Sequence, residues 1–191
     1  MNPDAEKWNQ LYKNGGPGQL QAASVLEDNR HLLPETGKAL DLACGRGANA
    51  ILLARHGLET HAWDISSEAI RLLETSSRQS DIQVHCAQRD VVAEPPAAES
   101  YDVIVVSRFL ERKLIPHLIT ALRPQGLIYY QTFTREPVDD TGPSNPDYRL
   151  NVNELLVMFT RLRILLYREE GRIGDITRGF RNEAMLIARK S

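Results

Sequence analysis

The stretch that decides the fold runs from Ala39 to Ala50 and reads ALDLACGRGANA. Its apolar run contains an acid, Asp41, and is followed by a turn with two glycines, Gly45 and Gly47. Glycine lets the backbone turn sharply and lets a ligand approach without meeting a Cβ atom. The stretch therefore predicts a strand, a ligand-binding turn and a helix, in that order.

On both sides of this stretch, short β-rich runs alternate with helical patterns. Such alternation is typical of crossover units and of an α/β fold with a largely parallel sheet. The run YDVIVV at 101–106 is the most continuously apolar, so we expect it at the centre of the sheet. Further strands are expected at 38–43, 58–64, 81–87, 127–133, 162–168 and 183–189, the last two as an antiparallel pair at the sheet edge.

Helical spacing fills most of the intervals between these strands. Ser66 is the expected N-cap of one helix, and Gly57 is the expected end of another. Pro116 is expected to begin a new helical segment, because proline is tolerated in the first turn of a helix. The other expected helices lie at 19–33, 108–122 and 153–160.

Length, charge and cysteine content exclude several classes of protein. A chain of 191 residues fits one domain, 1–191, and its net charge of -2 provides no basic field for a nucleic-acid backbone. Two separated cysteines suit a reducing cytosol, and no apolar run approaches the roughly 20 residues that span a bilayer. We expect a cytoplasmic protein with small-molecule ligands and no nucleic-acid or membrane partner. Segment 1–33 is expected to cover the site, and the proline-containing segment 134–149 to act as a lid or binding loop.

The glycine turn allows two interpretations. The stretch 45–50 fits the pattern G-x-G-x-x-G/A, and Asp64 follows Gly45 by 19 residues (64 minus 45), close to the ~20 typical of an NAD-binding acid. However, Asp41 would repel a pyrophosphate and attract an ammonium group. Asp90 follows the expected third strand, where it can accept a hydrogen bond from the adenine amine. An adenosine that carries an amino acid fits all three acids, and 191 residues leave little room for a dehydrogenase's second domain.

The chain resembles class I S-adenosylmethionine-dependent methyltransferases over nearly its whole length. The matching segments are ALDLACGRG at 39–47, HAWDIS at 61–66, AQRDV at 87–91 and ALRPQGLIYYQTF at 121–133. Three more segments resemble small bacterial methyltransferases related to the tellurite-resistance type: WNQLY at 8–12, SRFLERKLIPHL at 107–118 and GPSNPDYRLNVNEL at 142–155. The resemblance implies a Rossmann-like fold with a seven-stranded, mostly parallel sheet, and S-adenosyl-L-methionine as cofactor.

The same resemblance implies which residues bind the cofactor. The glycine turn would border the methionine part, Asp41 would face its amino group, and Asp64 would hold the ribose hydroxyls. Adenine would lie against Ile65, Asp90 and Val91. Ala43 and Gln125 depart from the commoner motifs without removing a polar contact. The complete expected set is Asp41, Ala43, Gly45, Gly47, Asp64, Ile65, Asp90, Val91 and Ser107.

The acceptor side is less specific. An Asn-Pro-Pro-aromatic tetrad is absent after the fourth strand, where Ser107-Arg108-Phe109-Leu110 stands instead, and this argues against methylation of the exocyclic amines of bases. Aromatic side chains can cover a sulfonium through cation–π contacts, and arginines would favour an acidic or oxyanionic acceptor. Helix packing and a solvated helix face are the alternatives for these residues. The substrate-side candidates are Trp8, Tyr12, Arg108, Arg112 and Tyr148, of which Tyr12 and Arg108 are also catalytic candidates.

The sequence thus predicts methyl transfer from S-adenosylmethionine to a small molecule, with release of S-adenosylhomocysteine. An NAD(P)-binding oxidoreductase and a non-catalytic S-adenosylmethionine-binding protein are the alternatives, the second because no general base is evident. Cys44 is expected as a small buried filler. The five histidines are dispersed, and although His61 and His85 are expected on neighbouring strands, no ligand cluster is visible. We therefore expect no metal site.

Overall fold

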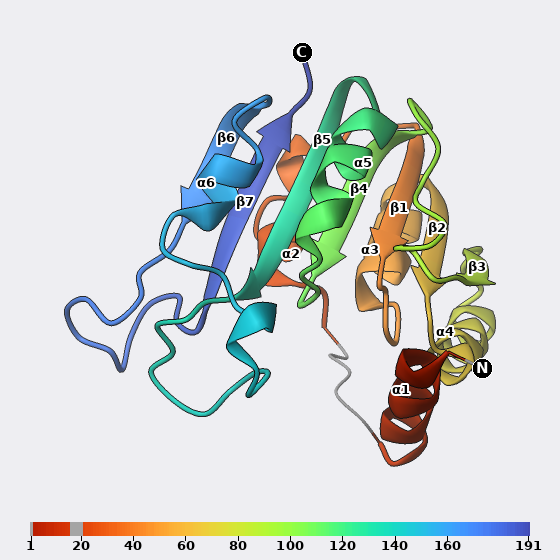
Figure 1. The fold of residues 1–191 in the computed structure, drawn as a ribbon. Helices are drawn as coiled ribbons and strands as arrows, with labels where there is room; N and C mark the ends of the chain where they lie inside the picture. The colour runs from red at the N-terminus through yellow and green to blue at the C-terminus, as the bar shows by residue number, and fades with distance from the viewer. Residues whose placement is uncertain (1, 16–20) are drawn as a thin grey trace.

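A seven-stranded sheet of order β3-β2-β1-β4-β5-β7-β6 forms the centre of the protein (Figure 1). The computed structural model describes residues 2–15 and 21–191. Strand β7 runs antiparallel to both β5 and β6, and the other neighbouring pairs are parallel. The predicted Rossmann-like sheet and its antiparallel C-terminal pair are confirmed. The strands are β1 Lys38–Leu42, β2 Glu59–Asp64, β3 His85–Gln88, β4 Tyr101–Ser107, β5 Leu122–Phe133, β6 Arg163–Arg168 and β7 Glu183–Arg189.

Helices cover both faces of the sheet. Helices α5 and α6 pack on one face, whereas α2 and α3 pack on the other (Figure 1). Among the described residues, no helix is long and apolar enough to cross a bilayer. The helices are α1 Pro3–Lys13, α2 Ser24–Glu27, α3 Ala48–His56, α4 Ser67–Gln79, α5 Ile115–Ala121 and α6 Glu154–Met158, with 3-10 turns at Arg30–Leu32, Arg112–Leu114 and Pro146–Tyr148.

Local sequence signals explain where several helices begin and end. The Ser66 hydroxyl accepts a hydrogen bond from the Ala69 N–H at 3.1 Å and caps α4, as predicted. Gly57, with φ of 109°, ends α3, because glycine adopts the left-handed backbone conformation of a helix C-terminus at little energetic cost. Pro116 lies in the first turn of α5, which confirms that a new helical segment begins there.

Several predicted elements are longer than the observed ones. The helix expected at 19–33 is reduced, in its described part, to α2 and a 3-10 turn, and Gln19 and Leu20 lie outside the described residues. The helix expected at 108–122 begins later, because Arg108 has a left-handed φ of 54° that interrupts helical geometry. The third strand starts at His85 instead of residue 81, since Asp81 is also left-handed, with φ of 53°.

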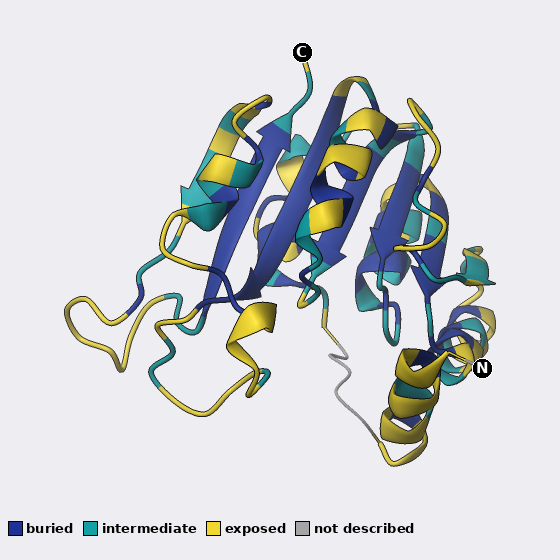
Figure 2. Cartoon of the chain, viewed as in Figure 1, coloured by how far each residue is buried: buried dark blue, intermediate teal, exposed yellow. Residues whose placement is uncertain are grey.

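The core follows the central strands. Val103, Ile104, Val105 and Val106 of β4 are fully buried, as expected for the middle of a parallel sheet. Figure 2 shows the buried strands as a continuous layer and α1 as a largely exposed helix at one edge. The predicted position of 101–106 at the centre is confirmed.

Candidate functional site

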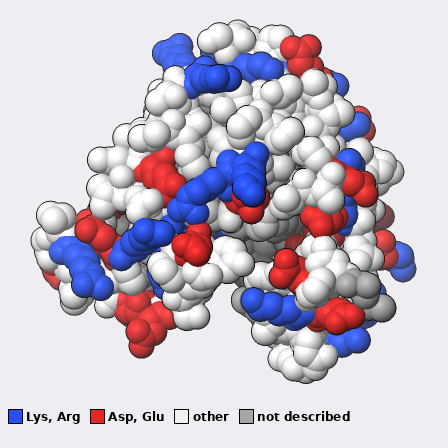
Figure 3. Space-filling view, viewed as in Figure 1, with Lys and Arg blue, Asp and Glu red and all other residues white. Residues whose placement is uncertain are grey.

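The carboxyl ends of β1, β2 and β4 meet at one edge of the sheet. Helix α1 and the segment 134–149 flank this edge on opposite sides (Figure 1), and the surface is indented there (Figure 3). The strand order reverses direction between β1 and β4. Open α/β sheets bind their ligands at such a reversal point, outside the carboxyl ends of the strands.

The glycine turn after β1 adopts an unusual backbone conformation. Ala43, Gly45 and Gly47 all have positive φ angles, of 54°, 53° and 75°. A Cβ atom on Gly47 would lie 2.2 Å from a methyl carbon of Leu73 in α4, and one on Gly45 would lie 2.7 Å from the Tyr12 hydroxyl. Both positions therefore require glycine for two reasons: a neighbouring side chain lies too close for a Cβ atom, and the backbone is left-handed.

Asp64 joins the end of β2 to the glycine turn. One carboxylate oxygen accepts a hydrogen bond from the Gly45 N–H, and the other accepts one from the Ser66 N–H, both at 2.8 Å. The residue is 6 % exposed, and burial raises the pKa of its carboxyl group. Because each carboxylate oxygen has two lone pairs, both oxygens keep capacity to accept from ribose hydroxyls.

Asp41 and Ser107 are linked beneath the turn by a residue that the sequence analysis missed. The Asn49 side-chain amide donates to the Asp41 carboxylate at 3.3 Å and to the Ser107 hydroxyl at 3.0 Å. Asp41 also accepts from the Ala50 N–H at 3.0 Å, and full burial raises its pKa to about 8. This placement makes Asp41 a support for the first turn of α3, and its contact with a ligand's amino group stays a prediction.

Asp90 follows β3 and lies at the same edge. One of its oxygens accepts from the backbone N–H groups of Val92 and Ala93, and the other accepts from the Asn2 amide at 2.8 Å. The neighbouring Val91 is buried. The structure thus places an acid at the end of β2 and another just after β3, and their contacts with a ribose and an adenine amine stay predictions.

Helix α1 is fastened over these acids. The Asn9 side-chain oxygen accepts from the Ser66 hydroxyl at 2.7 Å and from the Glu68 N–H at 3.1 Å. Asn2 reaches Asp90 from the N-cap of the same helix. The sequence carries no signal for Asn9, because its partners are more than fifty residues away and only the packing of α1 on α4 brings them together.

Tyr12 projects from α1 onto the glycine turn. It is buried, and burial, with added repulsion from Asp64 and Asp41, raises the pKa of its phenol. The phenol therefore stays neutral at physiological pH and can donate a hydrogen bond. The Trp8 ring lies 6.1 Å from the Tyr12 ring, between centroids, and it is only partly buried.

The arginine candidates occupy two different surroundings. Arg108 lies next to Ser107 at the carboxyl edge, where its Nε donates to the buried Glu183 at 2.6 Å. Glu183 also accepts from the Gln131 amide. The Arg108 guanidinium lies 5.6 Å from the centre of the Phe133 ring. Its charge is therefore largely offset by Glu183, a partner that no sequence motif indicates.

Arg112, by contrast, holds the segment 134–149 against the body of the protein. Its Nε donates to Glu154 at 2.6 Å, and its terminal nitrogens donate to the backbone oxygens of Asp147 and Arg149 at 2.6 and 3.0 Å. Tyr148, in the same segment, is 52 % exposed. The geometry gives Arg112 a supporting role in that segment, and the substrate roles of Arg112 and Tyr148 stay predictions.

Strand order, glycine turn and paired acids together define the class of protein. A sheet of order β3-β2-β1-β4-β5-β7-β6, with a glycine turn after β1 and acids at the end of β2 and just after β3, is the class I methyltransferase fold. Residues 19–176 match the family described as tellurite resistance protein TehB. The chain belongs to this family.

Three known proteins illustrate the relationship. A probable S-adenosyl-L-methionine-dependent methyltransferase TehB of Haemophilus influenzae is 32% identical over 89 residues, covering 45% of this chain and 31% of the relative. A ubiquinone biosynthesis O-methyltransferase of Albidiferax ferrireducens is 28% identical over 59% of this chain and 48% of its own length. A ribosomal RNA small subunit methyltransferase C of Alcanivorax borkumensis is 27% identical over 52% of this chain and 33% of its own length.

The matched regions span less than half the length of these relatives. The solved structure of TehB from Haemophilus influenzae superposes on this chain with a TM-score of 0.72. The two chains are 21% identical, and the match covers 96% of this chain and 67% of the other. At that identity the likeness shows the shared fold.

Proposed function

We propose that the protein transfers a methyl group from S-adenosylmethionine to a small-molecule acceptor and releases S-adenosylhomocysteine. The observation that carries this proposal is the Asp64 carboxylate, which is held against the Gly45 N–H at the switch point of the sheet. Membership of the TehB family supports it. The continuous sheet and the two free cysteines support a single domain that works in the cytoplasm.

The residues at this edge fit the proposed cofactor. Asp64 would accept hydrogen bonds from the ribose hydroxyls, and Asp90 from the adenine amine. Gly45 and Gly47 would border the methionine part, in a turn whose left-handed backbone packs closely against Tyr12 and Leu73. Asn49 would hold Asp41 and Ser107 in register beneath the turn. Ile65 and Val91 would supply apolar contacts to the adenine.

S-adenosylmethionine supplies an activated methyl group on a sulfonium, so the protein needs chiefly to align an acceptor and exclude water. Tyr12 lies against the glycine turn, where its ring can cover a positive charge through a cation–π contact. Trp8 extends the same aromatic surface. We propose that α1 covers the cofactor from one side and that the segment 134–149 acts as a lid from the other.

Several observations favour a small acceptor. The net charge of -2 provides no overall basic field for a nucleic-acid backbone. The names of the family and of two relatives mention tellurite resistance, ubiquinone and ribosomal RNA, so these names by themselves select no acceptor. Arg108 stands at the carboxyl edge beside Ser107, where a guanidinium favours small oxyanions or thiolates, although Glu183 largely offsets its charge.

The proposal is tested by a transfer assay with methyl-labelled S-adenosylmethionine and purified protein. The acceptors are tellurite, a small thiol, a catechol and small-subunit ribosomal RNA, and formation of S-adenosylhomocysteine is measured in parallel. We expect turnover with at least one small acceptor and its loss in Asp64→Ala. Transfer to the RNA alone would overturn the small-molecule assignment. Saturable cofactor binding with no transfer across the panel would instead favour a binding protein without catalysis.

A further inference from the structure

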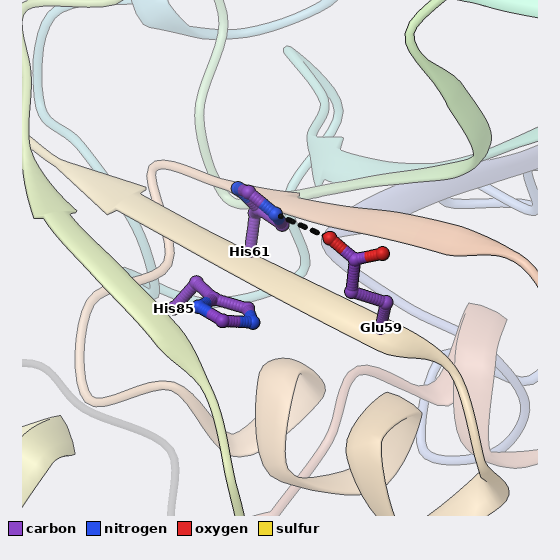
Figure 4. Close-up of side chains that lie close together, drawn as sticks. All are labelled: Glu59, His61 and His85. Atoms are coloured by element: carbon purple, nitrogen blue, oxygen red, sulfur yellow. Dashed lines mark hydrogen bonds and ion pairs between the residues drawn. The ribbon is translucent and has the colours of Figure 1, made fainter.

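Three metal-ligating side chains gather at the end of the sheet opposite the glycine turn. Glu59 and His61 belong to β2, and His85 begins the edge strand β3 (Figure 4). Residues two apart on a strand point to the same face, so Glu59 and His61 lie side by side. The register of the parallel pair puts His85 directly opposite His61. The three residues therefore share one face across two strands.

Their ligand atoms lie close enough to share one ion. The His61 Nε2 atom is 3.2 Å from a Glu59 carboxylate oxygen, and the centroids of the two imidazole rings are 5.0 Å apart. One ligand atom from each residue lies within 4.8 Å of the other two. Two imidazoles and one carboxylate form a donor set that suits zinc and neighbouring divalent metals, with a further position left for water.

The surroundings leave this cluster open on one side. The connection 89–100 between β3 and β4, which the structure describes throughout, contains no helix, so no helix from that connection covers this face of β2. Glu59 and His85 are exposed. On the inner side, the Tyr101 ring meets the His61 ring edge-on, with centroids 5.8 Å apart. An ion could enter from solvent and rest against an aromatic wall.

We propose that Glu59, His61 and His85 bind one divalent transition-metal ion of the zinc type, which links the edge strand β3 to β2. Glu59 and Asp64 lie at opposite ends of β2, five residues apart in an extended chain, or roughly 17 Å. The site is therefore separate from the proposed methyl-transfer site, and its role is to hold the sheet edge.

Lys38 provides a sharp internal test of this site. Its Nζ atom lies 3.4 Å from a Glu59 oxygen and 5.9 Å from the centre of the Tyr101 ring. The ammonium group competes with a metal ion for the carboxylate and repels the ion. Replacing Lys38 with glutamine removes both effects, so Lys38→Gln should bind the metal more tightly, by about three- to tenfold.

The experiment is a titration of the full chain with Zn²⁺, followed by calorimetry, and with Co²⁺, followed by visible absorption. We expect one ion per chain and an affinity that falls about a hundredfold in His61→Gln and His85→Gln. His56→Gln, at the exposed end of α3, is the matched control and should leave the affinity unchanged. Zn²⁺ should raise the melting temperature of the unaltered chain and of His56→Gln, but not that of His85→Gln.

Three results would overturn the proposal. If His85→Gln binds Zn²⁺ as tightly as the unaltered chain does, the ion lies elsewhere. An unchanged Zn²⁺ affinity in Lys38→Gln would lead to the same conclusion. A thiolate-to-Co²⁺ charge-transfer band would show that Cys86 or Cys44 is a ligand. Because His85 is exposed, His85→Gln should fold, and the melting temperature of each metal-free variant checks its folding directly.

Discussion

The two ends of β2 carry polar side chains in contrasting surroundings. At the carboxyl end, Asp64 is buried and accepts hydrogen bonds from two backbone N–H groups, one in the glycine turn and one at the start of α4. At the amino end, Glu59 is exposed and pairs with the side chains of His61 and Lys38. Hydrogen bonds from the backbone fix the Asp64 carboxylate in one geometry. The side-chain partners of Glu59 can instead be replaced by an incoming ion.

This contrast separates a site built for an organic ligand from one that suits an ion. Buried, backbone-bonded acids present oxygens in fixed positions, as recognition of a ribose requires. The exposed Glu59 and His85 side chains can adjust around a cation beside the partly buried His61, because no backbone hydrogen bond from the described residues holds the Glu59 carboxylate. The same strand therefore supports two kinds of chemistry at its two ends.

The largest expected effect concerns the packing of the glycine turn. Gly47→Ala should lower the free energy of unfolding by about 2–4 kcal/mol, because the new Cβ would meet Leu73 and the backbone would be strained. Urea unfolding measures the loss. Gly174→Ala is the matched control: its φ is 70°, and among the described residues nothing lies within 4 Å of the added atom, so the loss should stay near about 1 kcal/mol. Equal losses in the two variants would contradict the close packing.

The next effect is on the pH dependence of stability. The pKa of Asp41 is raised from 3.8 to about 8 in the folded chain, so between these values the folded state binds a proton that the unfolded state does not. The contribution of Asp41 to the free energy of unfolding should therefore be full below about pH 4 and fall as the pH rises toward 8. Asp41→Asn should reduce this fall between pH 5 and 8, by on the order of 3 kcal/mol.

The pKa of Asp64 is also raised by burial and contributes in the same direction, so some slope should remain in Asp41→Asn. Identical slopes in Asp41→Asn and the unaltered chain would show that Asp41 does not titrate in this range.

A smaller effect is expected on ligand affinity. Asp64→Ala should weaken binding of S-adenosylmethionine by about 1–3 kcal/mol, because ribose hydroxyls and two backbone N–H groups would lose their acceptor. Calorimetric titration measures the affinity, and a urea unfolding curve shows whether the variant is folded. Unchanged affinity for S-adenosylmethionine in a folded Asp64→Ala protein would show that Asp64 does not bind the cofactor.

The smallest effect is expected at the other end of the strand. In metal-free buffer, His85→Gln should change the free energy of unfolding by no more than about 0.5 kcal/mol, because His85 is exposed. Its affinity for S-adenosylmethionine should equal that of the unaltered chain. A clear loss of cofactor affinity would show that the two ends of β2 are coupled and that the two proposed sites are not independent.

The sheet could be predicted from sequence because its signals are local. The apolar run at 101–106, the glycine turn after Leu42 and the Ser66 cap each lie within a few residues of the element that they specify. The seven-stranded arrangement came from the resemblance to a known family. Element ends were less predictable, since left-handed backbone at Asp81 and Arg108 depends on tertiary packing and not on residue type alone.

The partners of the site residues could not be predicted, because they come from distant parts of the chain. Asn9 meets Ser66 only when α1 packs on α4, and Glu183 meets Arg108 only through the β5–β7 pairing. Asn49 carried one usable signal, an amide side chain directly after a glycine turn. The contact between His61 and His85 required the β2–β3 register, which spacing along the chain does not specify.

The most direct test of the central claim is a calorimetric titration of the purified chain with S-adenosylmethionine, S-adenosylhomocysteine and NADH in parallel. The account predicts saturable binding of the first two at one site per chain, weakened in Asp64→Ala, and no binding of NADH. Saturable binding of NADH alone would contradict it and would assign the turn at Ala39–Ala50 to a nicotinamide dinucleotide.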